Sequence, residues 1–252
     1  MLYQPVGCCI YCGTEKPPLS AEHIVPLGLN GEHILPAASC ATCAKETSRC
    51  ERTCLRTMLG QFRAATGMQT RRPKRRPKTY SLKYVASNRG KVVVLPVEDY
   101  PTTLFLFDFF PPQILRGVHP ADEELMAVPW SCMDQSRIAH LLDRLNADSV
   151  AIKPAVFHPI SFVRMLAKIG HSYAVAIYGM DGFRPLALDL ILGRDRRANY
   201  LVGGGADAFP HENCGYWLGH TLLPSGLIQI KIQLFPSLKT PVYQVVVGTA
   251  RV

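Results

Sequence analysis

Two pairs of cysteines constrain the fold of this chain more than any other feature. Two residues lie between Cys9 and Cys12 and two between Cys40 and Cys43, and 27 residues separate the pairs. A pair with this spacing forms a turn that points both thiolates at one ion, and two pairs complete the tetrahedral four-sulfur shell of structural zinc. The spacing therefore predicts a Zn²⁺ site in the first part of the chain. Cys8 could replace Cys9 through a three-residue spacing, but we prefer Cys9.

The cysteine usage favours a metal over disulfides. Seven of the nine cysteines lie between Cys8 and Cys54. The first ten residues lack the basic and apolar regions of a signal peptide, and no apolar run approaches the roughly 18 to 20 residues of a membrane span. We therefore expect a cytoplasmic protein without membrane association, where thiols stay reduced. Cys50 and Cys54 lie too far along the chain to join the same shell and are expected to pack in the core.

Positive charge is concentrated in the first third of the chain. Residues 1–80 carry 12 Lys and Arg against 5 Glu, a net charge of +7, whereas residues 81–252 carry 16 against 14. Six of the eight residues in 71–78 (RRPKRRPK) are basic and the other two are proline. Proline excludes a regular helix and like charges favour an extended, solvated backbone. We therefore predict a first module at 1–70, a basic linker at 71–80 and a second domain at 81–252.

The first module is expected to contain a short strand and a long helix. Residues 19–27 (LSAEHIVPL) are expected to form a short strand or extended turn ended by Pro26, and an Asn30-Gly31 loop follows. From Cys40 the chain is dominated by helix-compatible residues, with no proline and no glycine before Gly60. This pattern predicts one helix that begins at the second cysteine pair.

The second domain is predicted to be α+β with an antiparallel sheet. Strands are expected at 91–97 and 104–110, and helices at 136–147 and 161–179. Residues 226–235 (GLIQIKIQLF) alternate apolar and polar side chains, and turns separate them from strand-like flanks. That pattern predicts an antiparallel meander. His211, Cys214 and His220 lack the spacing of a second zinc site, and the sequence shows no function for this domain.

The residues between the cysteine pairs carry a family resemblance. Glu22-His23-Ile24-Val25-Pro26 lies between the first pair and a glycine-containing loop, and the second pair opens a helix. This order resembles the HNH endonucleases, the zinc-supported branch of the ββα-metal (His-Me finger) nucleases. The resemblance covers about residues 7–66, roughly a quarter of the chain. It implies a treble-clef-like ββα-metal module with structural zinc, followed by the α+β domain.

The resemblance also implies a catalytic role for two residues. In that family the strand histidine takes a proton from the attacking water, which maps to His23. An imidazole suits this task because its ordinary pKa of about 6.5 leaves it mostly neutral in the cell. The acid before it helps to hold one Mg²⁺ or Mn²⁺ ion, which maps to Glu22. Two metals with different roles are therefore implied.

The sequence departs from the family pattern at two positions. Ala44 stands where most members have an Asn or His ligand, and Leu35 stands where the middle Asn is usual. Five side chains could supply substitutes, namely Asn30, His33, Glu46, Thr47 and Glu51. A variant branch of the family has a Thr and a Glu that match Thr47 and Glu51.

The predicted partner is nucleic acid, most simply DNA. The basic residues of the linker, Arg71, Arg72, Lys74, Arg75, Arg76 and Lys78, would bind phosphates without reading bases. Our first hypothesis is a metal-dependent HNH endonuclease with His23 as the base. The alternatives are a catalytically degenerate, zinc-dependent nucleic-acid-binding module and a zinc-stabilised protein-interaction domain. No heptad or dimer surface is evident, so no oligomeric state is predicted.

Overall fold

The first part of the chain is a β-hairpin followed by a helical segment. The computed structural model describes residues 1–120, 125–152, 156–207 and 215–251, and His211 and Cys214 lie outside them. The elements are β1 (Leu19–His23), β2 (Ile34–Cys40), α1 (Ala41–Thr53) and α2 (Gly60–Ala65). β1 and β2 pair antiparallel, with Glu22 opposite Leu35 and His23 opposite Ile34.

The helix predicted from the second cysteine pair is confirmed, but it is not one regular helix. A π-helical turn at Cys54–Met58 separates α1 from α2. Its wider spacing is visible in the bond from the Leu59 N–H to the Cys54 carbonyl at 2.9 Å. Cys43, Thr47 and Cys50 are buried along one face of α1. That face is set by the helical repeat of three to four residues.

The basic segment differs from its predicted form. It contains a short 3₁₀ turn at Pro73–Arg75 instead of running extended throughout. Proline at the first position of the turn is compatible with this geometry because its missing N–H would have no partner there. The rest of the expectation holds, since every residue from Arg71 to Arg75 is exposed.

The remaining chain is α+β with antiparallel sheets, as predicted. The strands and helices of the middle part are β3 (Thr79–Ala86), β4 (Arg89–Pro96), β5 (Thr103–Phe109), β6 (Ala127–Met133), α3 (Gln135–Arg144) and β7 (Ser149–Ala151). Those of the last part are α4 (Pro159–Tyr178), β8 (Phe183–Pro185), α5 (Leu188–Leu192), α6 (Ala198–Leu201), β9 (Val202–Gly203), β10 (Tyr216–Leu222), β11 (Leu227–Leu234) and β12 (Val242–Ala250).

The main sheet has the order β10-β11-β12-β8, and β9 also pairs with β12. The predicted meander of β10, β11 and β12 is confirmed. The alternation in β11 does not separate a buried face from a solvated one, because Gln229 and Gln233 are also buried. Their amides have partners inside the protein, at Gln244 and the Thr240 carbonyl. Hydrogen bonding makes burial of such polar groups tolerable.

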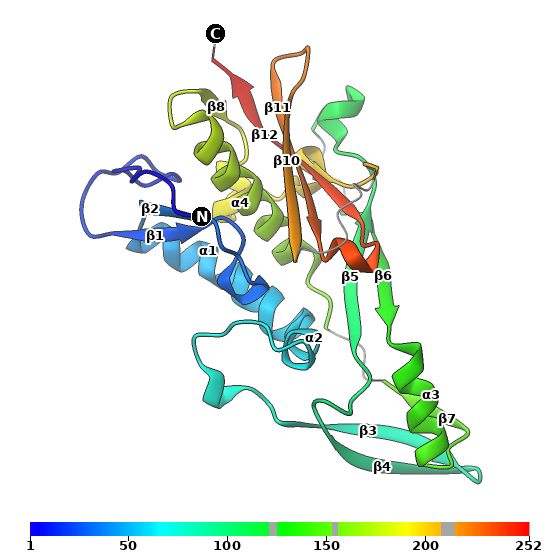
Figure 1. Cartoon of the computed structure of the whole chain (residues 1–252). Coiled ribbons are helices and arrows are strands. Elements are labelled where there is room, and N and C mark those ends of the chain that lie inside the picture. The colour runs from blue at the N-terminus through cyan, green and yellow to red at the C-terminus, as the bar shows by residue number, and fades with distance from the viewer. Residues whose placement is uncertain (121–124, 153–155, 208–214, 252) are drawn as a thin grey trace.

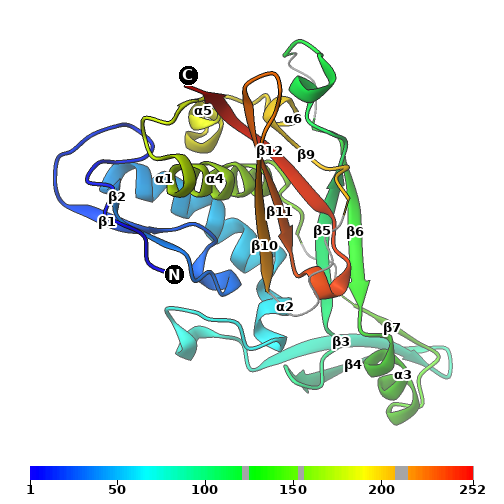
Figure 2. The same ribbon diagram turned by 45° about the horizontal axis from the view of Figure 1, so that its top comes forward.

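Helix α4 lies between the main sheet and α1 (Figures 1 and 2). It packs against β11 and β12 on one side and against α1 and α5 on others. Gly170 permits the close approach to β12, since an added Cβ would lie 3.0 Å from Val245. A helix buried on most sides is expected to be apolar all round. Lys168 and His171 in its middle are therefore conspicuous, because both are buried.

One hydrophobic core joins the two ends of the chain. It includes Ile24 and Leu35 of the hairpin together with Leu166 of α4 and Val245 of β12. A smaller core under the β4-β3-β7 sheet contains Leu82, Leu95, Tyr100 and Leu141. The β5–β6 ribbon connects the two regions (Figure 2). The domain boundaries at 71–80 stay a prediction, but the main core extends across them.

No helix within the described residues has both the length and the apolar character needed to cross a membrane.

Candidate functional site

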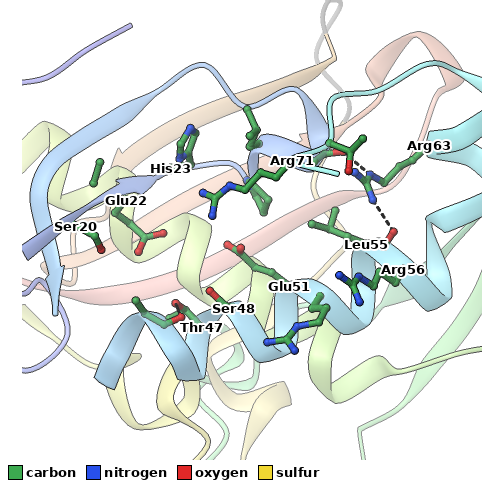
Figure 3. Close-up of a pocket in the computed structure, with 17 residues that line it drawn as sticks. Ser20, Glu22, His23, Thr47, Ser48, Glu51, Leu55, Arg56, Arg63 and Arg71 are labelled. Atoms are coloured by element: carbon green, nitrogen blue, oxygen red, sulfur yellow. Dashed lines mark hydrogen bonds between the residues drawn. The ribbon is translucent and has the colours of Figure 1, made fainter. Parts of the chain in front are cut away.

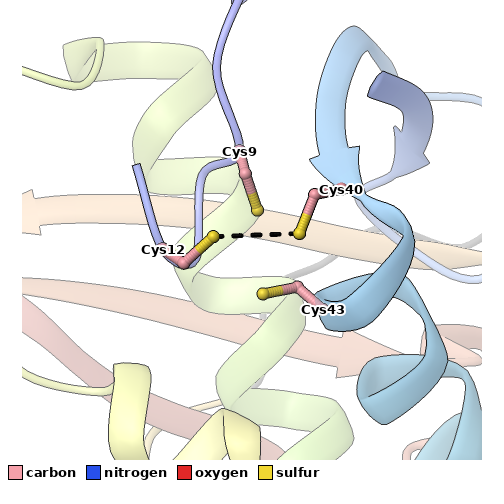
Figure 4. Close-up of side chains that lie close together, drawn as sticks. All are labelled: Cys9, Cys12, Cys40 and Cys43. Carbon is pink, nitrogen blue, oxygen red and sulfur yellow. Dashed lines mark hydrogen bonds between the residues drawn. The ribbon is translucent and has the colours of Figure 1, made fainter. Parts of the chain in front are cut away.

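The four predicted cysteines converge on one point. The Sγ atoms of Cys9, Cys12, Cys40 and Cys43 all lie within 4.8 Å of one another (Figure 4). Those of Cys12 and Cys40 are 3.8 Å apart. Cys8 lies outside this cluster, which confirms the choice of Cys9. Four thiolates in this arrangement could hold a structural metal ion such as zinc.

Local backbone geometry brings the four cysteines together. Gly13 follows the first pair at φ 73°, and its N–H donates to the Cys9 carbonyl at 2.8 Å. A side chain would disfavour this left-handed conformation, so glycine suits the turn. Cys40 ends β2 and Cys43 lies in the first turn of α1. The backbone N–H of Cys43 lowers the pKa of the Cys40 thiol to about 7, whereas burial raises the pKa of the Cys43 thiol.

Helix α4 holds the first cysteine turn in place. The His171 ring donates from Nε2 to the carbonyl of Ile10, between the two cysteines, at 2.7 Å. The neighbouring Tyr11 hydroxyl lies 3.3 Å from Ser172 Oγ. His171 is fully enclosed, and burial lowers its pKa to about 4. The imidazole is therefore neutral at pH 7, and its hydrogen bond supports the cysteine cluster.

A pocket of about 360 Å³ opens between the hairpin and α1. Glu22 and His23 reach it from β1, and Thr47, Ser48 and Glu51 reach it from α1. Figure 3 shows the carboxyl groups of Glu22 and Glu51 facing each other across it. Four arginines also line the pocket: Arg52, Arg56, Arg63 and Arg71. The pocket thus combines titratable groups with positive charge.

The surroundings of His23 favour its neutral imidazole form. Its side chain is half-buried, and burial lowers its pKa below the ordinary value. The positive charges of Lys168 and Arg71 lower the pKa further, whereas Glu51 opposes them. A neutral imidazole with a lowered pKa can accept a proton at neutral pH.

Lys168 lies behind the pocket and is completely buried. Its Nζ is 2.6 Å from Glu22 Oε1 and 2.9 Å from Glu51 Oε1. It also donates to the backbone carbonyls of His23 and of Ile24, the latter at 3.3 Å. Burial alone would lower the pKa of Lys168, but the two carboxylates outweigh it and raise the pKa, so the ammonium stays charged. For the acidic Glu22 the effect of burial has the opposite sign: burial raises the pKa of Glu22, and the charge of Lys168 opposes that rise.

Of the five residues considered as substitute ligands for a catalytic ion, two line the pocket and three make contacts outside it. Thr47 and Glu51 line the pocket. Asn30 accepts from the Gln69 N–H, and His33 bonds to the Tyr3 hydroxyl at 2.8 Å, so both are engaged elsewhere. Glu46 pairs with Arg49 on the surface of α1. At the two departures from the family pattern, Leu35 is buried in the core and Ala44 lines the pocket without a donor atom.

The space between the two carboxylates does not fit a divalent ion. Glu22 and Glu51 each direct one oxygen at the Lys168 ammonium, and a second cation there would meet strong repulsion at this range. Among the residues that the structure describes, the cysteine cluster is the one group of three or more His, Cys, Asp or Glu side chains close enough to share an ion. The predicted assignment of Mg²⁺ or Mn²⁺ to Glu22 is untested, and the position of the Lys168 ammonium argues against it.

The basic segment borders a second cavity of about 760 Å³. Arg72, Arg75 and Arg76 line it on one side, and Tyr80 lines it from β3. The two cavities share Leu55, Arg56, Arg63 and Thr70, so they adjoin. The Arg63 guanidinium donates to the backbone carbonyls of Gly28, Leu55 and Gln69. The N–H groups that make these bonds are therefore used within the protein and are not offered to a ligand.

Sequence reasoning did not find Lys168. The signal was a lysine in the middle of the apolar stretch at 161–179, which was expected to be a buried helix. Because a buried charge is normally paired, a lysine inside a buried helix predicts an acidic partner from another part of the chain. The pairing with Glu22 and Glu51 was not legible, since it joins segments more than 100 residues apart.

Comparisons with protein-family models, with curated proteins and with solved structures find no match for this chain.

Proposed function

We propose that this protein is an HNH-type endonuclease that hydrolyses phosphodiester bonds in DNA with His23 as general base. The observation that carries the proposal is the position of His23. A neutral, half-buried imidazole lines a pocket that also presents arginine side chains. The order of elements supports it as well, since a hairpin and a helix are joined at a four-cysteine cluster. This is the order implied by the HNH resemblance.

In the proposed reaction the chain's own groups bind phosphate and move one proton. Arg52, Arg56 and Arg71 attract the phosphodiester to the pocket. His23 takes a proton from a water molecule as its oxygen attacks phosphorus. The bond from phosphorus to the leaving oxygen then breaks, and the leaving oxygen is protonated by solvent. No step is assigned to Mg²⁺ or Mn²⁺.

The substrate would continue from the pocket toward the basic segment. The second cavity adjoins the first and carries Arg72, Arg75 and Arg76 on its wall. Contacts of this kind follow the phosphate backbone and do not select a sequence. The proposal therefore includes DNA binding with little base preference and strong salt dependence.

The test is a plasmid-nicking assay on zinc-loaded protein, with and without Mg²⁺ or Mn²⁺. We expect cleavage by the wild type, and at least about a hundred-fold less by His23→Ala, the scale of general base catalysis. His33→Ala is the matched control, because His33 belongs to the same hairpin region but bonds to Tyr3 outside the pocket. Equal cleavage by the wild type and His23→Ala would refute the role of His23.

A second candidate function is DNA binding without catalysis. Ala44 favours it, because it contributes no donor atom to the pocket wall where most HNH enzymes have a metal ligand. Under this alternative the wild type binds DNA but cleaves none under any metal condition. The same assay, combined with a binding measurement, distinguishes the two.

A further inference from the structure

The oxygen atoms around Lys168 Nζ form a cage suited to a cation. Two carboxylate oxygens, from Glu22 and Glu51, and two backbone carbonyls, from His23 and Ile24, all accept from the ammonium. Oxygen ligands of this kind are those that bind hard divalent cations in proteins. Here the cation belongs to the polypeptide itself.

We propose that the Lys168 ammonium is the built-in cation of this site, and that it holds Glu22, Glu51 and the His23 backbone where a divalent ion would otherwise be required. Three observations support this. Lys168 is completely buried, so it cannot contact a substrate. It has more acceptors around it than the three protons it can donate. Its contacts join β1 to α1, the two walls of the pocket.

Lys168 is accordingly a positioning residue and not a catalytic one. By fixing the His23 carbonyl it fixes the strand from which the imidazole reaches the pocket. By pairing with Glu22 and Glu51 it prevents two carboxylates on facing elements from repelling each other. Its importance for hydrolysis rests on the proposed function, whereas its role as a cation does not.

The experiment tests whether removing the ammonium creates a metal site. Zinc-loaded wild type, Lys168→Ala and Lys168→Ala/Glu51→Gln are titrated with Mn²⁺, and bound Mn²⁺ is followed by electron paramagnetic resonance and by thermal melting. Lys45→Ala, an exposed lysine of α1, is the matched control. None of these readouts needs nuclease activity, so failure here and failure of the proposed function are distinguishable.

We expect Lys168→Ala to bind one Mn²⁺ at least about ten-fold more tightly than the wild type, because a repelling charge is replaced by space between two carboxylates. Mn²⁺ should also raise its melting temperature. Glu51→Gln in the double variant should weaken this gain, and Lys45→Ala should behave as the wild type.

Two results would overturn the proposal. The first is a wild-type protein that already binds one Mn²⁺ as tightly as Lys168→Ala, at a site lost in Glu22→Gln. The second is a Lys168→Ala protein that gains no affinity for Mn²⁺ or that remains unfolded when Mn²⁺ is added. If Lys168→Ala folds only with Mn²⁺ present, the ion has replaced the ammonium and the proposal is supported.

Discussion

Replacing His171 with glutamine should remove one source of the acid sensitivity of this protein, the protonation of a buried imidazole. His171 is buried beside the first cysteine turn, and its pKa is lowered to about 4 by burial. In the unfolded chain the same imidazole has an ordinary pKa of about 6.5. Glutamine keeps an N–H for the carbonyl of Ile10 but cannot take up a proton in this range.

The sign and size follow from linkage. The folded-state pKa lies below the unfolded value, so the stabilising contribution is present above pH 6.5 and is lost as pH falls toward the folded pKa. Relative to neutral pH, the loss is about 2 kcal/mol at pH 5 and approaches about 3 kcal/mol at full protonation of the unfolded and folded forms. A domain with ordinary stability of about 5 to 15 kcal/mol would be measurably weakened.

The assay is urea unfolding of wild type and His171→Gln at a series of pH values from about 7 to 5, with zinc content measured at each. The difference in unfolding free energy between the two proteins should shrink by about 2 kcal/mol over this range. Acid release of zinc affects both proteins and largely cancels in the difference. The exposed His140→Gln serves as control and should parallel the wild type. If the difference in unfolding free energy between the wild type and His171→Gln does not change with pH, His171 does not titrate with a lowered pKa in the folded protein.

Three further predictions concern the metal centre, the basic segment and the hairpin. Cys43→Ser should bind no zinc by elemental analysis and should melt about 10 °C or more below the zinc-loaded wild type by calorimetry. A Cys43→Ser protein that retains one zinc per chain would contradict the four-cysteine site. Changing the exposed Arg72, Lys74, Arg75 and Lys78 to Gln should lower the slope of log affinity against log salt for duplex DNA by up to about 3 to 4. The control is a Gln variant of the exposed Lys91. If both variants give the same slope, the basic segment does not contact phosphates. Gly31→Ala should destabilise the protein by more than about 2 kcal/mol in urea unfolding, because the added Cβ would lie 1.8 Å from the Val25 carbonyl oxygen. Gly90→Ala is the control and should be nearly neutral, because no atom lies near the added Cβ. Similar effects of the two substitutions would show that the hairpin backbone shifts to accommodate the methyl group.

Local patterns predicted most of the secondary structure. The meander was legible because β11 alternates side chains and turns bound it, and α4 was legible from its apolar face. Strands β3 and β6 were not predicted, and neither were β7, β8 and β9, whose two or three residues carry no periodic signal. The π-helical turn in the first module was also missed, because its residues are ordinary helix formers.

The candidate site was predictable to the extent that it is local in sequence. Cysteine spacing located the cluster, and the family resemblance drew attention to the Glu22-His23 pair, which lines the pocket. Lys168 and His171 were not found, because both reach the first module from α4 through long-range packing. Sequence periodicity predicts which residues are buried, but it does not predict which partner a buried charged side chain contacts.

The distance along the chain between the two halves of the charged cluster has a consequence for biosynthesis. His23 and Lys168 are 145 residues apart, which is roughly 7 to 30 s of translation at about 5 to 20 residues per second. Throughout that interval the nascent hairpin and α1 exist without the ammonium that offsets Glu22 and Glu51. The pocket therefore cannot reach its final form on a growing polypeptide until α4 has left the ribosome, and a prematurely terminated chain would never acquire it.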